Sequence, residues 1–105
     1  MITKKRQGSF LEFFYFGGAC STQQVGTLNG FFVSPTEFHV GNVYTKSAWR
    51  NQGIATALLK RLLFELKRNK VTNVTLDDCS DTGRCYTKLG FSYLEQGYPE
   101  MELLL

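Results

Sequence analysis

A glycine-containing turn is the part of the sequence best suited to bind a ligand. It is Arg50-Asn51-Gln52-Gly53-Ile54-Ala55, between a short β-prone run and a long amphipathic segment. The first turn of a helix presents backbone N–H groups that lack intrahelical partners, at the positive end of the helix dipole, so an anion is favoured there. Gly53 lets the backbone approach a ligand closely, and Arg50 adds a positive charge. Many helices begin after a glycine turn and bind nothing, so this pattern indicates an anion site without naming the anion.

A long amphipathic helix is predicted from Gln52 to Asn69. Apolar residues recur there at helical spacing and charged residues occupy the other side, so the helix should pack on a sheet. The predicted core-facing positions are Ala55, Leu58, Leu59, Leu62 and Leu66. The basic residues among residues 60–70 favour a solvated face over a nucleic-acid-binding patch.

Aromatic and β-branched runs around this helix predict a sheet and an α/β fold. The predicted strands are Ser9 to Phe16, Thr27 to Ser34, Glu37 to Thr45, Val71 to Leu76, Phe91 to Glu95 and Met101 to Leu105. Short connections make the first three an antiparallel meander, and the helix has the right length to cross over to a parallel fourth strand. The last strand is expected at an edge of the sheet.

The remaining segments are predicted as a lead-in, a turn and a short helix. Met1 to Gly8 is polar and basic and should be frayed, and Gln23 to Gly26 should form a hairpin turn. A short helix from Asp81 to Leu89 should end at Gly90, where glycine usually follows a helix. The aspartates before this helix favour helix capping over a metal site, because they lack the glycine-containing spacing of a calcium loop.

Length and composition predict a single packed domain over residues 1–105. The chain has 105 residues, of which 43% are hydrophobic and 14% aromatic. This is enough for one core and argues against disorder. The net charge of +3 falls short of the footprint of a nucleic-acid-binding domain. No apolar run approaches the roughly 18 residues of a membrane span, so no membrane partner is expected.

Three cysteines, Cys20, Cys79 and Cys85, form no CxxC pair. A reduced cytosolic or nuclear compartment is the simplest interpretation, with the thiols as small buried side chains, and we expect a cytoplasmic protein. The alternative is a lipoprotein-like export signal ending at Cys20, because a basic start precedes an aromatic run. Glu12 interrupts that run, so we keep the segment in the fold.

Two motifs resemble those of the GNAT N-acetyltransferase superfamily. The turn from Arg50 to Ala55 fits the acetyl-coenzyme A signature Q/R-x-x-G-x-G/A. Ser80 to Phe91 looks like the second motif, G-R-x-x-Y-x-K-L-G-F, one residue shorter between Arg84 and Tyr86. Either motif alone would be weak, and the two in this order and at this separation are more specific. The resemblance begins at the strand Thr27 to Ser34 and runs to the end of the sequence.

This resemblance implies a fold and a cofactor. The fold would be a GNAT-like mixed, mostly antiparallel sheet with a long central helix and a short C-terminal helix, splayed between the strands that end at Thr45 and Leu76. Acetyl-coenzyme A would lie in the splay, with its pyrophosphate on the N–H groups of the glycine turn, and no metal is expected. The implied cofactor-binding residues are Val43, Tyr44, Thr45, Arg50, Asn51, Gln52, Gly53, Ile54, Ala55 and Thr56.

The implied reaction moves an acetyl group from acetyl-coenzyme A to a small-molecule or peptide amine, by direct attack in a ternary complex. In the family, a tyrosine at the position matched by Tyr86 commonly protonates the departing thiolate, and a phenol can donate that proton. The alternative is that Tyr86 only packs under the sheet. Cys85 as a covalent acetyl carrier is disfavoured, because the sequence shows no environment that would activate its thiol.

His39 is the one histidine of the chain and the candidate general base. It lies six residues before Thr45, where some family members place a catalytic glutamate, and a neutral imidazole is a competent base. Residues 39, 41, 43 and 45 should share one strand face, and Glu37 on the same face is the reserve candidate. A lone histidine is more often a structural hydrogen-bonding residue, and many such enzymes use an ordered water instead.

The chain departs from the family at its N-terminal end. Family members usually have a first strand and two helices before the strand matched by Ser9 to Phe16, and those helices build much of the acceptor pocket. Their absence leaves three hypotheses: an unusually open acceptor site, a homodimer in which a second copy completes that site, or a loss of catalysis. In the last case the chain would be a catalytically silent acetyl-coenzyme A-binding or protein-interaction module.

Overall fold

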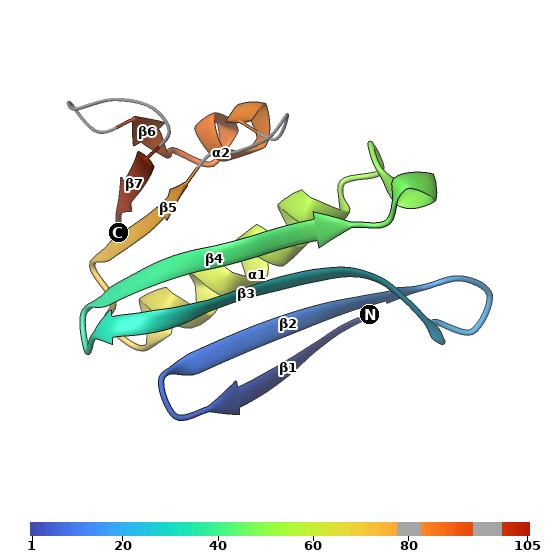
Figure 1. The fold of residues 1–105 in the computed structure, drawn as a ribbon, viewed down its shortest axis with the longest axis horizontal. Coiled ribbons are helices and arrows are strands. Elements are labelled where there is room, and N and C mark those ends of the chain that lie inside the picture. Colours follow the sequence, from blue (N-terminus) through green and yellow to red (C-terminus); the bar gives the residue numbers. More distant parts are fainter. Residues whose placement is uncertain (78–82, 94–99) are drawn as a thin grey trace.

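The computed structural model describes residues 1–77, 83–93 and 100–105. In chain order the elements are β1 (Ile2–Gln7), β2 (Phe10–Gly17), β3 (Gln23–Ser34), β4 (Glu37–Thr45), the short 3-10 helix η1 (Ser47–Trp49), α1 (Ile54–Arg68), β5 (Asn73–Asp77), α2 (Gly83–Lys88), β6 (Ser92–Tyr93) and β7 (Glu100–Leu104). Within the described ranges the strands form one seven-stranded sheet in the order β1-β2-β3-β4-β5-β7-β6 (Figure 1). Only β4 and β5 run parallel, so the sheet is mixed and mostly antiparallel, as predicted.

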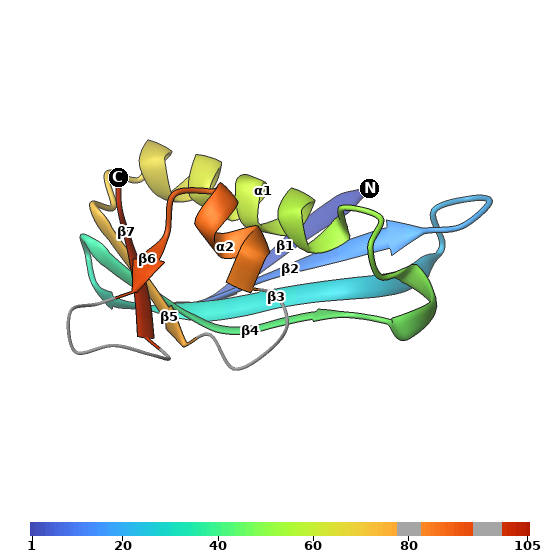
Figure 2. The same ribbon diagram turned by 90° about the horizontal axis from the view of Figure 1, so that it is seen from above.

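Both helices lie on the same side of strands β1 to β4 (Figure 2). We call that side of the sheet the helix face and the opposite side the open face. α1 is amphipathic as predicted, although Ile54 rather than Ala55 is buried in its first turn. Its buried side chains each contribute about 1.5 to 3 kcal/mol relative to exposure, which fixes α1 on the sheet. They are Ile54, Leu58, Leu59, Leu62 and Leu66.

The sheet splays between β4 and β5. β5 pairs with β4 only over the register Glu37↔Asn73 to Val40↔Leu76. Beyond Val40, β4 continues to Thr45 and pairs with β3 alone. The two parallel strands therefore diverge at the C-terminal end of β4, as Figure 1 shows. This is the V-shaped opening that the family resemblance implied.

A β-bulge in β4 corrects the predicted strand face. The register of β3 and β4 passes from Gly30↔Val40 to Asn29↔Asn42, so Gly41 is an extra residue on β4. One extra residue reverses the alternation of side chains beyond it. Val43 stands opposite the fully buried Leu28 and faces the helices. The prediction that residues 39, 41, 43 and 45 share a face was wrong, because His39 precedes the bulge and points to the open face.

The predicted frayed lead-in is a strand. β1 pairs with β2 along its whole length, from Ile2↔Tyr15 to Gln7↔Phe10. Two of its three basic side chains find partners on the helix face: the Lys4 amino group lies 3.3 Å from the Glu65 carboxylate, and the Arg6 guanidinium stacks over the Phe32 ring at 4.6 Å. The sequence pattern hides this strand because charged residues are common on edge strands. A strand therefore does precede β2, contrary to expectation, whereas no helix stands between β1 and β2.

Two further predictions about the strands were wrong. Gln23 to Gly26 begins β3, and the hairpin turn lies earlier, where Gly18 and Ser21 have positive φ values of 88° and 51°. The last strand is not at the edge, because β7 lies between β5 and the short edge strand β6. The order of the strands along the chain does not show this arrangement, in which the last strand, β7, inserts between β5 and β6.

Some predictions fall on residues that the structure does not describe. They concern residues 78–82, which hold most of the aspartate cluster and the start of the predicted short helix, and residues 94–99. In the described part, α2 is followed by Gly90 with a φ of 103°, which agrees with the predicted helix end. Neither described helix combines the length and apolarity that crossing a membrane would take.

Candidate functional site

The turn before α1 has the backbone geometry of an anion site. Asn51 and Gly53 adopt left-handed conformations, with φ values of 64° and 81°. Alternating backbone conformations of this kind direct successive N–H groups into one concavity that favours an anion. No atom lies within 4 Å of the position that a Cβ on Gly53 would occupy, so the backbone there is open to a ligand. The predicted residues Arg50 to Ala55 therefore meet at the start of α1.

The electrostatics of this turn also favour an anion. From Phe38 to Phe64 the sequence has no acidic residue, and four basic residues fall in that stretch. The Arg50 Nε donates a hydrogen bond to the Thr45 carbonyl at 3.0 Å, and its guanidinium lies 5.9 Å from the centroid of the Tyr44 ring. Arg50 is thus held between the end of β4 and the start of α1, where its positive charge favours an anion.

Contacts to β2 and β3 position the turn. The Lys46 N–H donates to the carbonyl of Val25 at 2.9 Å, and Val25 is the extra residue of a bulge in β3. A Cβ on Gly17 would lie 2.9 Å from the Trp49 ring, so Trp49 packs directly on the strand backbone. Sequence reasoning did not select Gly17 as a functional residue, because it ended the strand at Phe16, whereas β2 includes Gly17.

Gly26 also permits a close approach, in this case between β3 and the first turn of α1. A Cβ there would meet the Ile54 Cγ2 at 2.8 Å and the carbonyl oxygen of Tyr44 at 3.3 Å. The first turn of α1 can therefore sit against β3 and β4 only because residue 26 has no side chain. Sequence reasoning missed Gly26 as well, because it placed this residue in a turn.

The C-terminal half of β4 forms one wall of the splay. Val43 and Thr45 face the helices and Tyr44 faces the open face. The Thr45 hydroxyl is buried and makes no hydrogen bond within the described part of the chain. An orphaned buried hydroxyl is costly, by about 1 to 3 kcal/mol, and one next to the glycine turn is consistent with a polar ligand nearby.

His39 lies on the open face at the paired end of the splay. Its Nδ1 is 2.8 Å from the Thr75 hydroxyl on β5, and its ring centroid is 5.5 Å from that of Phe31. The contact with Thr75 fixes the ring and leaves Nε2 without a hydrogen bond to the described residues. Thr75 was not among the predicted residues, because nothing in the sequence pairs it with His39. Glu37 is exposed on the same face, two residues earlier.

Tyr86 lies on the other side of the sheet. Its side chain is 5% exposed and belongs to the hydrophobic core, with its ring 5.9 Å from that of Phe91 in an edge-on arrangement. The structure therefore unites the turn with the end of β4 and places His39 and Tyr86 on opposite faces. Cys85 and Arg84 belong to α2, and their side chains lie outside the described part.

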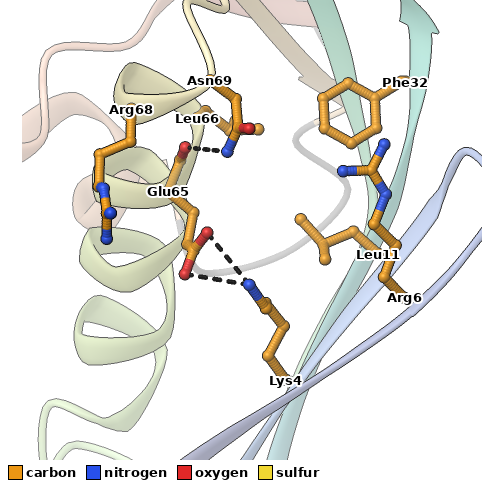
Figure 3. A pocket seen from close by; sticks show the side chains of 8 residues that line it. All are labelled: Lys4, Arg6, Leu11, Phe32, Glu65, Leu66, Arg68 and Asn69. Atoms are coloured by element: carbon orange, nitrogen blue, oxygen red, sulfur yellow. Dashed lines mark hydrogen bonds and ion pairs between the residues drawn. The ribbon is translucent and has the colours of Figure 1, made fainter.

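Two open hollows lie away from the glycine turn, near the last turn of α1. The first has a volume of about 310 Å³ and is lined by Lys4, Arg6, Leu11, Phe32, Glu65, Leu66, Arg68 and Asn69 (Figure 3). The second, of about 490 Å³, shares Arg6, Phe32 and Asn69 with it. Neither includes a residue of the turn, and the negative end of the helix dipole opposes an anion there. In the described ranges no group of three His, Cys, Asp or Glu residues could hold a metal ion.

Comparison with protein families gives one match. A model of the acetyltransferase (GNAT) domain matches residues 13–93, which include the glycine turn, both candidate catalytic residues and Thr75. A comparison with curated proteins gave no match.

Several solved structures share the fold. Rv2747 from Mycobacterium tuberculosis, in complex with CoA, has a TM-score of 0.78 at 15% identity, covering 92% of this chain and 76% of that one. The PaiA N-acetyltransferase from Thermoplasma acidophilum, in complex with coenzyme A, has a TM-score of 0.75 at 19% identity, covering 92% and 62%. The ribosomal-protein-S18-alanine N-acetyltransferase from Escherichia coli has a TM-score of 0.75 at 20% identity, covering 94% and 71%. At these identities the similarity is one of fold.

Proposed function

The chain belongs to the GNAT acetyltransferase family, and from that premise we propose that it transfers an acetyl group from acetyl-CoA to an amine. The observation that carries the proposal is the turn before α1. Its left-handed residues, its open Gly53 and the lack of acidic residues in the sequence from Phe38 to Phe64 fit a pyrophosphate. The acceptor is a small molecule or a peptide with a free amine.

The same geometry supports a specific placement of acetyl-CoA. Its pyrophosphate lies on the N–H groups of Gln52 to Ala55, with Arg50 as the neighbouring positive charge. Its pantetheine arm runs along Val43-Tyr44-Thr45, where β4 has no partner strand among the described residues on the side of the splay. Two of the similar structures are complexes with CoA, which supports this choice of cofactor.

Two side chains would handle the protons of the reaction. The amine nitrogen attacks the thioester carbonyl carbon, a C–N bond forms, the C–S bond breaks and a thiolate leaves. His39, held by Thr75, takes the proton that the amine loses, directly or through a water. Tyr86 gives its phenolic proton to the thiolate. The two groups act from opposite faces of the sheet, and the splay between β4 and β5 connects those faces.

A catalytically silent acetyl-CoA-binding module is the second candidate. The observation that favours it is the connection between β1 and β2, which is only Gly8 and Ser9. No helix inserted there covers the acceptor side. The burial of Tyr86 in the core also agrees with a packing role for that residue.

Binding and turnover distinguish the two candidates. We expect acetyl-CoA to raise the melting temperature of the protein, since a ligand that binds only the folded state stabilises it. An enzyme should also release free coenzyme A when offered an amine from a panel of polyamines, aminoglycosides, amino acids and peptides. Stabilisation with background release across the panel supports the silent module. No stabilisation at all overturns both candidates.

A further inference from the structure

The strands around the splay are acidic although the chain as a whole is basic. The net charge is +3, with 12 lysine and arginine residues, and none of those basic residues lies in the described strands β4, β5, β6 and β7. These strands carry four carboxylates instead. They are Glu37, Asp77, Glu100 and Glu102. A separation of charge of this kind attracts a cationic ligand.

All four carboxylates lie on the open face. Successive side chains of a strand point to opposite faces, and the residues next to the carboxylates in sequence belong to the core under the helices. These core residues are Phe38, Leu76 and Met101. After Lys70 the sequence has only two basic residues, Arg84 and Lys88, and both belong to α2, which Figure 2 shows on the helix face. The negative charge of this part of the open face is therefore not balanced from the same side.

Asp77 stands where the sheet splays. The last pair between β4 and β5 is Val40↔Leu76, so Asp77 is the residue of β5 that has no partner on β4. It pairs with Glu100 of β7, and the Cβ atoms of such a cross-strand pair lie about 5 Å apart. Two carboxylates thus border the opening from the side of β5, opposite the second half of β4.

His39 lies between an exposed aromatic ring and these carboxylates. One cross-strand row of the open face consists of Phe31, His39, Thr75 and Glu102. The Phe31 ring is 44% exposed and its centroid lies 5.5 Å from that of the imidazole. Neighbouring strands are about 4.8 Å apart and two residues of a strand cover about 7 Å, so Asp77 and Glu102 stand on the order of 8 to 10 Å from His39.

We propose that the acceptor is a linear polyamine, which Asp77 and Glu102 select by binding its second ammonium group. This inference rests on the proposed function, because it places the reacting nitrogen at His39. The reacting nitrogen is neutral and forms the new C–N bond as the C–S bond of acetyl-CoA breaks, whereas the second nitrogen stays protonated at neutral pH. Phe31 packs against the methylene chain and attracts a cation to its ring face.

Other classes of amine fit this surface less well. An amino acid brings a carboxylate, which the four carboxylates repel. A peptide brings carbonyl groups and an aminoglycoside brings hydroxyl groups, and both would lose hydrogen bonds to water over the ring of Phe31. A linear polyamine carries only cations, which the carboxylates bind, and methylene groups, which the aromatic ring covers.

The first test compares two acceptors that differ in one group. Putrescine and butylamine have the same carbon chain, and only putrescine has a second amine. We expect the wild-type kcat/KM to be at least roughly tenfold higher for putrescine, beyond the statistical gain from a second reactive nitrogen. Equal values overturn the proposal and leave the proposed function in place, and so does a higher value for an amino acid, a peptide or an aminoglycoside.

Asp77→Asn and Glu102→Gln test which charges select the acceptor. Each variant removes one negative charge and keeps the size of the side chain, so each should lower the ratio of the putrescine and butylamine kcat/KM values at least roughly threefold. Glu65→Gln is the matched control, because it makes the same change on the helix face, where Glu65 pairs with Lys4, and it should keep the ratio. A double variant of Asp77→Asn with Glu102→Gln that keeps the full ratio overturns the proposal.

A binding measurement separates this proposal from the proposed function. The whole chain is titrated with spermidine in a calorimeter, in the presence of coenzyme A, which has no acetyl group to transfer. Binding should weaken at least roughly threefold in Asp77→Asn and stay unchanged in Glu65→Gln. Spermidine binding of this kind without turnover of any amine supports the polyamine surface and removes the enzyme. Turnover of another amine without spermidine binding overturns the surface and leaves the enzyme in place.

Discussion

Gly53 is the residue on which the placement of the cofactor depends most. Its φ of 81° is a conformation that a β-branched residue rarely adopts, and its backbone faces open space. Gly53→Val should cost about 1 to 3 kcal/mol of stability from backbone strain and should abolish acetyl-CoA binding, because the side chain would stand where the pyrophosphate lies. The measurement is the shift in melting temperature on adding acetyl-CoA.

Gly8 supplies the matched control for this experiment. It has a φ of 58°, nothing lies within 4 Å of its Cβ position, and it sits in the turn between β1 and β2. Gly8→Val should therefore lower stability by a similar amount and keep the full shift with acetyl-CoA. If Gly53→Val keeps the shift as well, the pyrophosphate is not at this turn.

Tyr86 can be tested by removing one oxygen atom. Tyr86→Phe keeps the ring in the core beside Phe91 and removes only the proton donor. We expect turnover to fall roughly a hundredfold, which is the usual scale for a general acid, while the melting-temperature shift with acetyl-CoA stays as in wild type. Tyr15→Phe, at a half-buried tyrosine of the helix face, is the control and should change neither quantity. Unchanged turnover in Tyr86→Phe removes that residue from the mechanism.

At the scale of elements, the junction of β3, β4 and α1 decides where the turn lies. Gly26→Ala should destabilise the protein by about 1 to 3 kcal/mol, because the new Cβ would lie 2.8 Å from the Ile54 Cγ2 and force the first turn of α1 outward. The same displacement moves the N–H groups of the turn, so acetyl-CoA binding should weaken. Chemical denaturation and calorimetric titration measure the two effects.

A double-mutant cycle tests whether this contact is the cause. Ile54→Ala removes the carbon atom that the new Cβ would meet. Gly26→Ala together with Ile54→Ala should therefore lose less stability than the two single variants added together. If the stability losses of the two single variants simply add, the side chain introduced at residue 26 destabilises the protein through a contact other than the one with α1.

The bulge at Gly41 is the second structural feature that matters at the scale of elements. It turns Val43 and Thr45 toward the helices while His39, two residues before it, stays on the open face. A regular strand would place all three side chains on one face. In the function that we propose, the bulge thus lets one strand contribute to the cofactor wall with its second half and to the acceptor side with its first half.

At the scale of the whole molecule, the chain is a thin layered structure with one face uncovered. The helices close one side of the sheet, and aromatic and acidic side chains occupy the other. The melting and turnover measurements therefore report on two separate features: the turn and the reacting groups.

Much of the fold could be predicted from the sequence because its signals are local. The apolar period of α1, the glycine turn before it and the β-branched run of β5 each reflect contacts within a few residues. The parallel pairing of β4 with β5 followed from the length of the crossover. β1 was missed because its contacts are not local. The partners of Lys4 and Arg6, which are Glu65 and Phe32, are distant in sequence.

The sequence by itself determined which residues form the glycine turn that we propose as the cofactor site, since strand, glycine and helix are adjacent along the chain and anion binding there needs only backbone N–H groups and one arginine. Only the tertiary structure decided what surrounds them. Thr75 reaches His39, and Gly26 admits Ile54, through contacts between segments far apart in sequence. The bulge at Gly41 places the side chains after it on the opposite face of β4 from the predicted one, because one inserted residue reverses a period of two. Only the pairing of β4 with β3 shows that this residue is inserted.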